Sequence, residues 1–501
     1  MFITGRLTEH ATTQGDKVIT SFAGRQLTYQ QFYEQAKRLA AYYQSKGLKK
    51  GDPIAFLLPN SDYFLVAYYA AHLGGFAALP INHKLAAPEI QYILEHSEAK
   101  HLIYDTRFDD TLKQLSDTLQ QVETVLKVGS EHSLEEVLND SSFIYESVDL
   151  TSKDVNVIFY TSGTTGRPKG VMLSAGATEA TAQIWGEAMG LNHEDRVQIV
   201  TPLFHCAASH VFSIPVIYAG GTIVIEEAFS PEAAMDTLEN EDITIFFGVP
   251  AMYSILLNNP RMKELNLPKL RLFTYGAAPM PYELVKKVKE LYPNVSVQNL
   301  YGQTENSPAA TTLKDHFALD KIGSVGEMLP KTEVQVVDEF GESLPTGQVG
   351  EIVVKGPQLM NGYLKNEEAT NQAIQNGWLY TGDLGRFDED GLLYIVDRKK
   401  DMIIRGGENV YPVEVEEVLY QIPEVLEAAV VGVPHPVYGE VPKAYVVLKN
   451  DQHLTEEDVK TYCSKNIAKY KIPEEIDFLE ELPRNASGKV LKNVLREHQT
   501  A

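Results

Sequence analysis

Cysteine is almost absent from the sequence. Cys206 and Cys463 are the two cysteines in 501 residues, and they lie far apart. This number excludes a disulfide framework and a cysteine-rich zinc cluster, and it is typical of a reducing compartment. The first six residues also lack the basic-then-apolar pattern of a secretory signal. We therefore expect a cytoplasmic protein.

Long apolar runs are missing too. A membrane-spanning helix needs about 20 consecutive, mostly apolar residues. The nearest stretch, residues 211–225, is interrupted by serine, proline, glycine and threonine. It reads as buried core, and we predict no transmembrane span.

Positive charge is the third shortage. The chain has 44 Lys and Arg against 68 Asp and Glu, so its net charge is −24. Such a chain is a poor candidate for non-specific nucleic-acid binding. If the ligand is a nucleotide, its phosphates must be met by donors gathered locally. An apolar fraction of 44% over 501 residues indicates a globular chain of two or three domains.

Strands and helices alternate along the first part of the chain. Thr28 to Gln31 forms a capping-box pattern that predicts a helix ending at Gly47. Alternating elements of this length indicate a parallel sheet covered on both faces, with ligands beyond the carboxyl ends of its strands. The further elements predicted here are strands at 53–58, 76–81 and 101–104 and helices at 61–75 and 88–96.

Residues 160–170, Tyr-Thr-Ser-Gly-Thr-Thr-Gly-Arg-Pro-Lys-Gly, follow an apolar strand at 155–159. Their glycines allow tight turns with the backbone N–H groups against an anion, the hydroxyls donate hydrogen bonds, and the two cations neutralise charge. The spacing is not that of a Walker loop. A solvated turn is the plain alternative. The composition favours a loop that holds a polyphosphate.

Three further strand-and-loop units are predicted at 200–205, 243–250 and 270–278. His205 and His210 have no accompanying carboxylate cluster, so we do not expect a metal pair there. Residues 299–305, Asn-Leu-Tyr-Gly-Gln-Thr-Glu, run from a strand through a glycine turn to a hydroxyl and a carboxylate. Glu305 could be an ordinary acid at a helix start or a hard oxygen ligand for Mg²⁺.

The pattern of predicted elements changes from Gly323 onward. Short strands with Gly and Pro turns predict a small β unit, and the last hundred residues predict a compact α+β unit. Between them lies Asp397-Arg-Lys-Lys-Asp401, a charged run typical of a solvated face or linker. Three short patterns accompany these units: Thr-Gly-Asp at 381–383, Gly-Gly-Glu-Asn at 406–409 and Ser-Gly-Lys at 487–489.

The stretches at 160–170, 299–305, 381–383, 397–409 and 487–489 together resemble the signature of the acyl-adenylate-forming superfamily, in the family's order. That superfamily includes acyl- and aryl-CoA synthetases, peptide-synthetase adenylation domains and firefly-type luciferases. The resemblance implies an α/β fold. Its large N-terminal domain, residues 1–396, has parallel-sheet layers and a small β unit. A hinge at 397–401 would join it to a mobile α+β C-terminal domain at 402–501.

The resemblance also implies site roles. Lys489 would swing in to the reacting carboxylate, Glu305 would bind Mg²⁺ on the ATP phosphates, and Thr304 would contact the α-phosphate. Asp383 would hold the ribose hydroxyls. Tyr301 would stack near the adenine, Arg398 would reach the nucleotide, and Lys400 would be the pivot. The remaining residues implied for ATP are Thr161, Ser162, Gly163, Thr164, Thr165, Gly166, Lys169, Gly276, Ala277, Ala278 and Gly302.

Two further groups of residues concern the other substrates. Gly406, Gly407 and Glu408 match the loop that lines the pantetheine tunnel in CoA ligases. His205 matches the side chain that lines the acid pocket beside the reacting carboxylate. Small residues would leave an apolar slot beside it. The residues expected to line this acyl pocket are Phe204, His205, Phe212, Val249, Met252, Gly276 and Ala309, and core packing is the plain alternative for each.

The implied reaction is ATP-dependent ligation of an acid to CoA. A carboxylate and ATP would give acyl-AMP and pyrophosphate, and CoA would then take the acyl group and release AMP. ATP, Mg²⁺ and CoA are the expected cofactor and co-substrates. The resemblance favours a medium- or long-chain fatty acid. An aryl acid of benzoate, hydroxycinnamate or succinylbenzoate type, a carrier-protein acceptor and a non-catalytic binding protein stay as alternatives. Peripheral membrane contact and a homodimer are left open.

Overall fold

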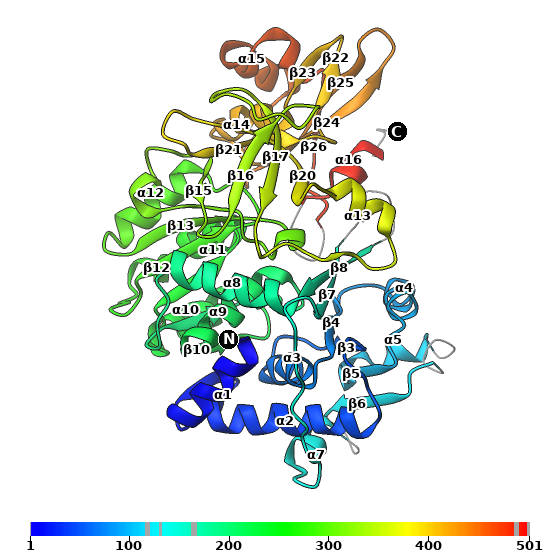
Figure 1. The fold of residues 1–501 in the computed structure, drawn as a ribbon. Helices are drawn as coiled ribbons and strands as arrows, with labels where there is room; N and C mark the ends of the chain where they lie inside the picture. Colours follow the sequence, from blue (N-terminus) through cyan, green and yellow to red (C-terminus); the bar gives the residue numbers. More distant parts are fainter. Residues whose placement is uncertain (1, 116–120, 130–132, 162–167, 485–489, 498–501) are drawn as a thin grey trace. The chain divides into compact units, whose positions relative to one another are not determined.

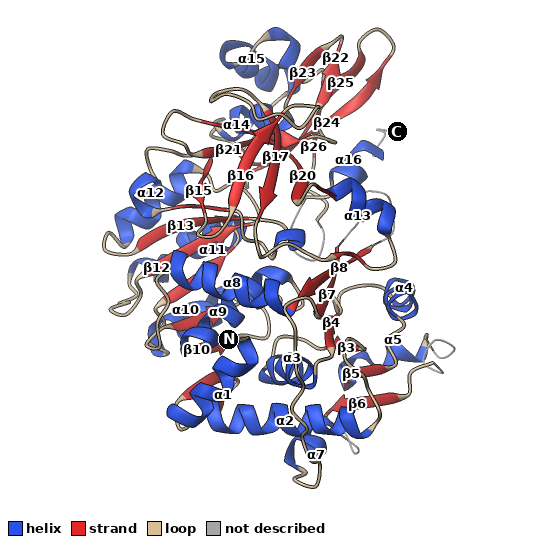
Figure 2. Cartoon of the chain, in the orientation of Figure 1, coloured by secondary structure: helices blue, strands red, loops and turns tan. Residues whose placement is uncertain are grey.

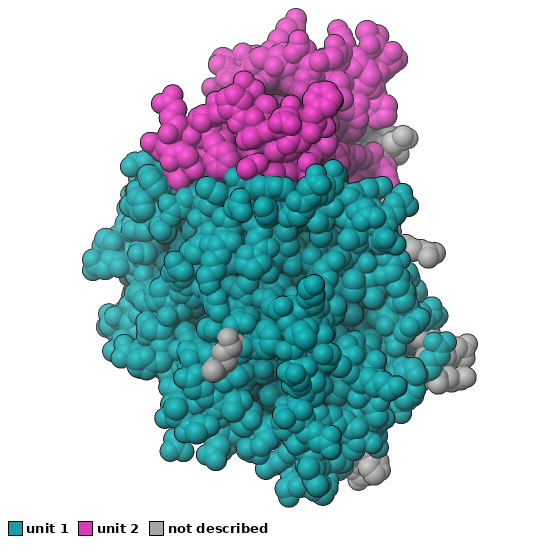
Figure 3. Space-filling model, in the orientation of Figure 1, with its two compact units in different colours: residues 1–334, 354–379 teal, residues 335–353, 380–501 magenta. Residues whose placement is uncertain are grey.

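The computed structural model describes residues 2–115, 121–129, 133–161, 168–484 and 490–497. The chain forms two compact units, residues 1–334 with 354–379 and residues 335–353 with 380–501 (Figure 3). The predicted fold class, a large α/β part and a smaller α+β part, is confirmed. The predicted hinge at 397–401 lies within the second unit, and its role as a hinge stays a prediction.

One sheet of the first unit has the strand order β18-β8-β7-β4-β3-β5-β6 (Figure 1). Strands β4, β3, β5 and β6 are mutually parallel, and β7 joins β4 in parallel. The predicted parallel layer is therefore present, with β8 and β18 added antiparallel at one edge. The bounds are β3 Pro53–Leu57, β4 Ala77–Pro80, β5 His101–Asp105, β6 Thr124–Val128, β7 Val155–Thr161, β8 Lys169–Ser174 and β18 Gly362–Tyr363.

The second sheet of this unit runs β15-β14-β13-β12-β11-β9-β10-β1-β2. The strands from β13 to β1 are parallel, and the outer strands at both sides are antiparallel. The small β unit expected from Gly323 begins one strand later, because β15 pairs with β14 in this sheet. The bounds are β1 Val18–Phe22, β2 Arg25–Thr28, β9 Arg196–Ile199, β10 Thr222–Ile225, β11 Ile245–Gly248, β12 Leu272–Gly276, β13 Ser296–Tyr301, β14 Thr311–Leu313 and β15 Ser324–Met328.

Helices and strands alternate along much of the first unit (Figure 2), and several helices, among them α2, α3 and α8, begin at a side-chain cap. The predicted capping box of α2 is formed: Gln31 N–H donates to Thr28 Oγ1 and Thr28 N–H donates to Gln31 Oε1. Gly47, with φ 83°, follows its last turn. The bounds are α1 Ile3–Thr13, α2 Tyr29–Ser45, α3 Asp62–Gly74, α4 Ala87–Ser97, α5 Asp109–Lys113, α7 Leu134–Asn139, α8 Ala175–Ala188, α9 Ile214–Ala219, α10 Pro231–Asn240, α11 Pro250–Asn258, α12 Tyr282–Leu291 and α13 Glu367–Ala373.

One continuous core cluster joins both sheets of the first unit. It contains Phe56 of β3, Phe64 of α3, Trp185 of α8 and Val197 of β9, all fully buried. Helix α3 is apolar around nearly its whole circumference, as expected of a helix enclosed by the core. In the part of the chain that the structure describes, no helix has the length and apolar character needed to cross a bilayer.

The second unit holds most of the residues of the remaining strands, except β19, which lies in the first unit. One group runs β16-β17-β20-β21 in order, and β19 pairs with β20. A separate sheet runs β23-β22-β25-β24, with β26 pairing with β25, and helix α14 packs on β24. The bounds are β16 Glu333–Val337, β17 Gly350–Lys355, β19 Ile374–Gln375, β20 Trp378–Phe387, β21 Leu393–Arg398, β22 Ile403–Arg405, β23 Glu408–Val410, α14 Pro412–Tyr420, β24 Val425–His435, β25 Gly439–Leu448, α15 Glu456–Asn466, β26 Glu475–Phe478 and α16 Lys492–Glu497.

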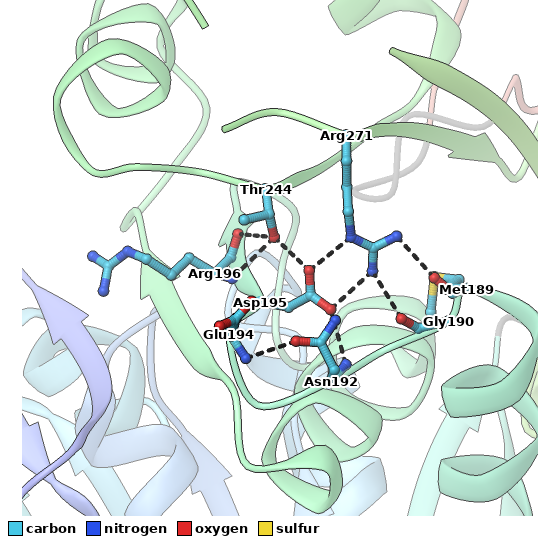
Figure 4. Close-up of polar contacts among 8 residues, drawn as sticks. All are labelled: Met189, Gly190, Asn192, Glu194, Asp195, Arg196, Thr244 and Arg271. Atoms are coloured by element: carbon cyan, nitrogen blue, oxygen red, sulfur yellow. Dashed lines mark hydrogen bonds and ion pairs between the residues drawn. The ribbon is translucent and has the colours of Figure 1, made fainter. Parts of the chain in front are cut away.

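A buried carboxylate fastens the amino ends of β9, β11 and β12 (Figure 4). Asp195 accepts hydrogen bonds from Arg271 Nε and Nη2, each at 2.8 Å, and from Thr244 Oγ1 at 2.8 Å. The backbone N–H of Asn192 adds a fourth at 2.9 Å. Burial alone would raise the pKa of Asp195, but these hydrogen bonds outweigh it, and the pKa lies below its ordinary value. The clamp lies at the opposite ends of these strands from their carboxyl termini.

We expect Asp195→Asn to lower the free energy of unfolding by roughly 2 kcal/mol at neutral pH, because the partly exposed Arg271 and the neighbouring donors lose a buried, charged hydrogen-bond acceptor. Urea unfolding measures this. Because the folded pKa of Asp195 is lowered, the stabilisation is complete above the unfolded pKa of about 4. It is lost as the pH falls through the folded value, so the difference between variant and wild type should shrink in acid.

The control is Asp110→Asn, which removes an exposed ion pair with Lys113 at 2.7 Å. It should leave the free energy of unfolding nearly unchanged, since exposed pairs contribute little. An equal, small effect of both substitutions would contradict the role assigned to Asp195.

Candidate active site

The phosphate loop joins two antiparallel strands, β7 and β8. The apolar residues of β7 are buried, as the sequence predicts for a core strand. In the register of the pair, Thr161 lies opposite Lys169, so two predicted ATP-binding residues stand at the two ends of one short loop. The other predicted residues of this loop lie outside the described residues: Ser162, Gly163, Thr164, Thr165 and Gly166.

Helix α4 holds both ends of this loop. The hydroxyl of Tyr160, just before it, lies 2.7 Å from His96 Nδ1. The hydroxyl of Tyr92 donates to the carbonyl of Pro168, just after it, at 3.2 Å. Burial lowers the pKa of His96. A neutral imidazole can accept from the tyrosine hydroxyl at Nδ1, so these two bonds can anchor the loop without adding charge.

A tyrosine connects the phosphate-loop lysine to the predicted metal ligand. The hydroxyl of Tyr363, in β18, donates to Glu305 Oε1 at 3.0 Å. The Lys169 ammonium lies 4.8 Å from the centroid of the Tyr363 ring, within the range of a cation–π contact. Glu305 also accepts at its carbonyl from the N–H of Met360, at 2.9 Å. The structure thus brings together Lys169 and Glu305, which are 136 positions apart in the sequence.

Glu305 and Thr304 stand on a single 3₁₀ turn, Thr304–Asn306. The side chain of Asn306 organises it, because Asn306 Oδ1 accepts from the N–H groups of Gln303, at 2.8 Å, and Ala309, at 3.2 Å. Ser307, with φ 49°, ends the turn. The strand before it, β13, ends at Tyr301, which is buried.

The predicted glycines near the nucleotide meet close backbone neighbours. A Cβ on Gly276, the last residue of β12, would lie 2.6 Å from the carbonyl oxygen of Leu300. A Cβ on Gly302 would lie 2.2 Å from the backbone of Pro308. Ala277 has φ 66°, a conformation that costs alanine energy and that clusters at functional sites. Ala277 and Ala278 are exposed, as backbone that approaches a ligand must be.

His205 stands a few residues after β9 and is half-buried. Burial lowers its pKa, which favours the neutral ring. The N–H of Ala207 donates to His205 Nδ1 at 3.3 Å, so the ring proton is assigned to Nε2. A π-helix, Ala207–Ser213, follows at once, and such segments recur at functional sites. His210, by contrast, is fully buried against Tyr68, with its pKa lowered to about 3.

The residues predicted for the acyl pocket are mostly packed. Phe212 is fully buried and stacks on Phe247 with ring centroids 4.5 Å apart. The rings of Phe204 and His83 are nearly perpendicular with centroids 5.2 Å apart, and Ala309 is fully buried. Val249 and Met252 are half-buried at the start of α11. These positions supply an apolar, aromatic lining, and their role as a pocket stays a prediction.

The second unit holds the other predicted nucleotide residues. Asp383 of β20 and Arg398 of β21 lie opposite each other in the register, and Arg398 Nε is 3.0 Å from Asp383 Oδ1. Asp383 is 3% exposed. Thr381 Oγ1 donates to the carbonyl of Ile352 at 2.7 Å and accepts from the N–H of Asp383 at 3.1 Å. Lys489 lies outside the described residues.

The predicted hinge segment is anchored within the second unit. Asp397 accepts from the N–H groups of Arg398, at 2.6 Å, and Val413, at 3.1 Å. Burial raises the pKa of Asp397 to about 6, against the attraction of Lys492 and these two N–H groups. Asp401 pairs with Arg496 of α16. Lys400, the predicted pivot, is exposed.

The glycines predicted to face pantetheine form a hairpin turn. Strands β22 and β23 pair antiparallel, with Arg405 opposite Glu408, and Gly406 and Gly407 connect them. Their φ values, 59° and 92°, are both positive, which is the requirement of a two-residue type I′ turn. The turn therefore needs glycine for its own geometry. Gly406, Gly407 and Glu408 are exposed, and their contact with CoA stays a prediction.

Several residues of the site were not predicted. Tyr363, Asn306 and the pair Tyr92 and His96 carry no charge pattern or motif that marks them in the sequence. Tyr363, Tyr92 and His96 act through bonds to residues that only folding brings close, whereas Asn306 organises a local turn. Asp397 lay inside the predicted hinge, but its burial could not be foreseen from a run of charged residues.

Glu305 fits a magnesium ion without further protein carboxylates. Mg²⁺ is commonly held by one or two carboxylates together with substrate phosphates, and it keeps several waters. Among the described residues there is no cluster of three or more His, Cys, Asp or Glu side chains that could cage a metal by itself. One carboxylate beside a phosphate loop therefore suits a metal that arrives with a nucleotide.

Comparison with known proteins defines the class. The sequence model described as AMP-binding enzyme matches residues 7–364, and that of the AMP-binding enzyme C-terminal domain matches residues 414–489. The chain belongs to the AMP-binding enzyme family. Together with its relatives, this makes it an AMP-forming acid–CoA ligase with the acid left open.

Its relatives differ in the acid that their names specify. The chain is 35% identical to a feruloyl-CoA synthase of Amycolatopsis sp, covering 98% of this chain and 96% of the relative. It is 37% identical to the long-chain-fatty-acid–CoA ligase FadD13 of Mycobacterium tuberculosis, covering 95% and 93%. It is 36% identical to a 2-succinylbenzoate–CoA ligase of Bacillus licheniformis, covering 98% of each.

Solved structures agree with the fold. ATP-bound MatB from Rhodopseudomonas palustris is 32% identical, with a TM-score of 0.91 and 99% of each chain covered. The O-succinylbenzoate coenzyme A synthetase MenE from Bacillus subtilis, in complex with ATP and magnesium ion, is 31% identical. Its TM-score is 0.86, with 97% of this chain and 98% of that chain covered.

The raised pKa of Asp397 gives a stability prediction. Between the unfolded pKa of about 4 and the folded value of about 6, the folded state holds the extra proton, so wild-type stability falls as the pH rises. Asp397→Asn lacks this titration. Thermal unfolding at several pH values should therefore show the variant gaining on wild type by up to about 3 kcal/mol as the pH rises through 6. A difference that does not change with pH would contradict the assignment.

Proposed function

We propose that the protein activates a medium- or long-chain fatty acid with ATP and transfers the acyl group to CoA. The observation that carries the ATP half is the grouping of Lys169, Tyr363 and Glu305 at the exit of the phosphate loop. In a chain with a net charge of −24, a loop lysine beside a metal-binding carboxylate is the local arrangement that a polyphosphate requires.

In the first half-reaction, a carboxylate oxygen of the acid attacks the α-phosphorus of ATP, and pyrophosphate leaves. Two anions must meet, so the protein has to position them and offset their charge. Lys169 and the loop N–H groups would hold the phosphates, and Lys489 would sit at the reacting carboxylate. Mg²⁺ bound at Glu305 would neutralise part of the phosphate charge. His205, neutral, would donate from Nε2 to a carboxylate or acyl oxygen.

In the second half-reaction, the CoA thiol attacks the acyl carbon, and AMP leaves. Asp383 would accept from the ribose hydroxyls in both halves, and its bond to Arg398 keeps its carboxylate oriented. The two halves would use two orientations of the residues after the hinge at Lys400. The exposed turn at Gly406 and Gly407 would then meet the pantetheine chain.

The apolar lining supports an apolar acid. Phe204, Phe212, Val249 and Met252 offer no charged group that would select a polar acyl chain. The fatty acyl-CoA ligase among the relatives agrees with this choice. The stacked pair Phe212 and Phe247 favours a second candidate, an aryl acid, because flat aromatic faces pack well on a ring. Feruloyl- and succinylbenzoate-specific relatives support that alternative.

The proposal includes a cytoplasmic location. Cys206 and Cys463 are both buried and unpaired, as in proteins kept reduced. Sedimentation would test whether the protein is a homodimer, and vesicle binding would test for peripheral membrane contact.

The test of the acid is AMP release with Mg·ATP across a panel from butyrate to stearate and of benzoate, hydroxycinnamate and succinylbenzoate types, with and without CoA. A maximum among the aliphatic acids that depends on CoA is the expected result. A maximum on an aromatic acid would replace the fatty acid by the second candidate. Acid-dependent pyrophosphate exchange that continues unchanged when CoA is added would point to a carrier-protein acceptor. Absence of AMP release with every acid would contradict the proposal.

The role of Lys489 has its own test. Lys489→Ala should slow acyl-adenylate formation by roughly 100-fold or more, because it removes the charge that stabilises the transition state. Thioester formation from supplied acyl-adenylate should be nearly unchanged. Lys465→Ala, an exposed lysine of α15, is the matched control and should leave both rates unaltered. Equal losses in both half-reactions would refute this assignment.

A further inference from the structure

Tyr363 occupies a position that the backbone fixes on several sides. Strand β18 pairs antiparallel with β8, with Tyr363 opposite Val171. The N–H of Leu364 donates to the carbonyl of Gly170 at 2.7 Å, and the N–H of Tyr363 donates to Thr370 Oγ1 at 2.8 Å. A Cβ on Gly362, whose φ is 142°, would lie 2.7 Å from the Thr370 side chain, so the approach requires glycine. The tyrosine is thus held rigidly beside the phosphate loop.

The side chain of Tyr363 makes two different contacts with two oppositely charged groups. Its hydroxyl donates to Glu305 Oε1 at 3.0 Å, and its ring lies 4.8 Å from the Lys169 ammonium. A phenol is uncharged at neutral pH, so its hydroxyl can donate to the carboxylate. One neutral side chain therefore serves both the anion and the cation.

We propose that Tyr363 is a positioning residue for Mg·ATP, which orients the Glu305 carboxylate toward the metal and seats the Lys169 ammonium toward the phosphates. The inference deepens the proposed function and rests on it, since it assumes that Glu305 binds the metal and Lys169 the nucleotide.

The position of Tyr363 keeps the opposite charges of Lys169 and Glu305 from pairing with each other. Lys169 and Glu305, both of which the structure describes, make no direct ion pair with each other. Such a pair would have to be broken before either group could serve its ligand, which costs binding energy. A phenol between them holds each in place while leaving its charge available. The hydroxyl takes up one carboxylate oxygen, Oε1, which fixes the direction in which the other can point.

Binding measurements on Tyr363→Phe test the hydroxyl. The ring remains, so the contact with Lys169 is kept and the fold should survive. Isothermal titration of the full-length protein should show affinity for Mg·ATP falling roughly 10- to 100-fold, the usual effect of removing a group that orients a metal ligand. Affinity for ATP with a chelator in place of Mg²⁺ should be unchanged, because Lys169 is untouched.

Tyr104→Phe is the matched control. Tyr104 also donates its hydroxyl to a carboxylate, Asp109 Oδ1 at 2.6 Å, but at β5 and α5 rather than beside the phosphate loop. The Tyr104→Phe variant should bind Mg·ATP with the affinity of the wild type. Tyr363→Leu removes the ring as well and should weaken metal-free ATP binding in addition. Thermal melting of each variant checks that the fold is intact.

The outcomes separate this inference from the proposed function. Wild-type affinity of Tyr363→Phe for Mg·ATP would overturn the positioning role while leaving the ligase reaction in place. An equal loss of affinity with and without Mg²⁺ would overturn the link to the metal. If wild type itself binds no Mg·ATP and forms no AMP with any acid, the proposed function fails, and this inference fails with it.

Discussion

Hydrogen bonding between β18 and β8 is the interaction on which the predicted nucleotide site of the first unit depends. It places residues 361–364 alongside the strand that leaves the phosphate loop. Tyr363 is carried to Lys169 and Glu305 by this pairing, and Met360 reaches the carbonyl of Glu305 from the same segment. The bonds are between backbone groups, so they hold the site together without committing any charged side chain.

Because the chain is acidic, it matters that these bonds leave the charged side chains free of one another. A polyphosphate approaching a protein with a net charge of −24 is repelled at long range, so its binding must come from groups close at hand. At the predicted phosphate site, the cation Lys169 has a partner that does not neutralise it. Lys169 faces a neutral ring, and the loop ends are fixed by uncharged bonds to Tyr92 and His96. In the second unit, by contrast, Arg398 is already paired with Asp383.

Local patterns predicted the elements well because they depend on neighbouring residues. The capping box at Thr28 and the helix after Ser61 were read from a few adjacent positions, and the structure confirms both. The phosphate loop and Glu305 were found by motif. Tyr363 and the clamp of Asp195 with Arg271 were missed, because their partners lie far away in the sequence. Asn306 was missed for a different reason: its bonds to Gln303 and Ala309 are local, but no motif marks them. A hydrophobic repeat of two or four residues carries no information about a hydrogen bond between side chains that are 58 positions apart, such as Tyr363 and Glu305.

The predicted nucleotide end and the predicted acid end of the site are held by different kinds of interaction, which would let one fold serve relatives named for unlike acids. Backbone pairing and short turns fix Thr304, Glu305 and Lys169, so changes of side-chain volume elsewhere leave them in place. The predicted acid end is made of core side chains such as Phe212 and Phe247, whose packing contributes to stability. Exchanging them would reshape the pocket and strain the core together, because a packed interior has little free space. On the proposed assignment, these core side chains rather than the phosphate loop would set the selectivity for the acid.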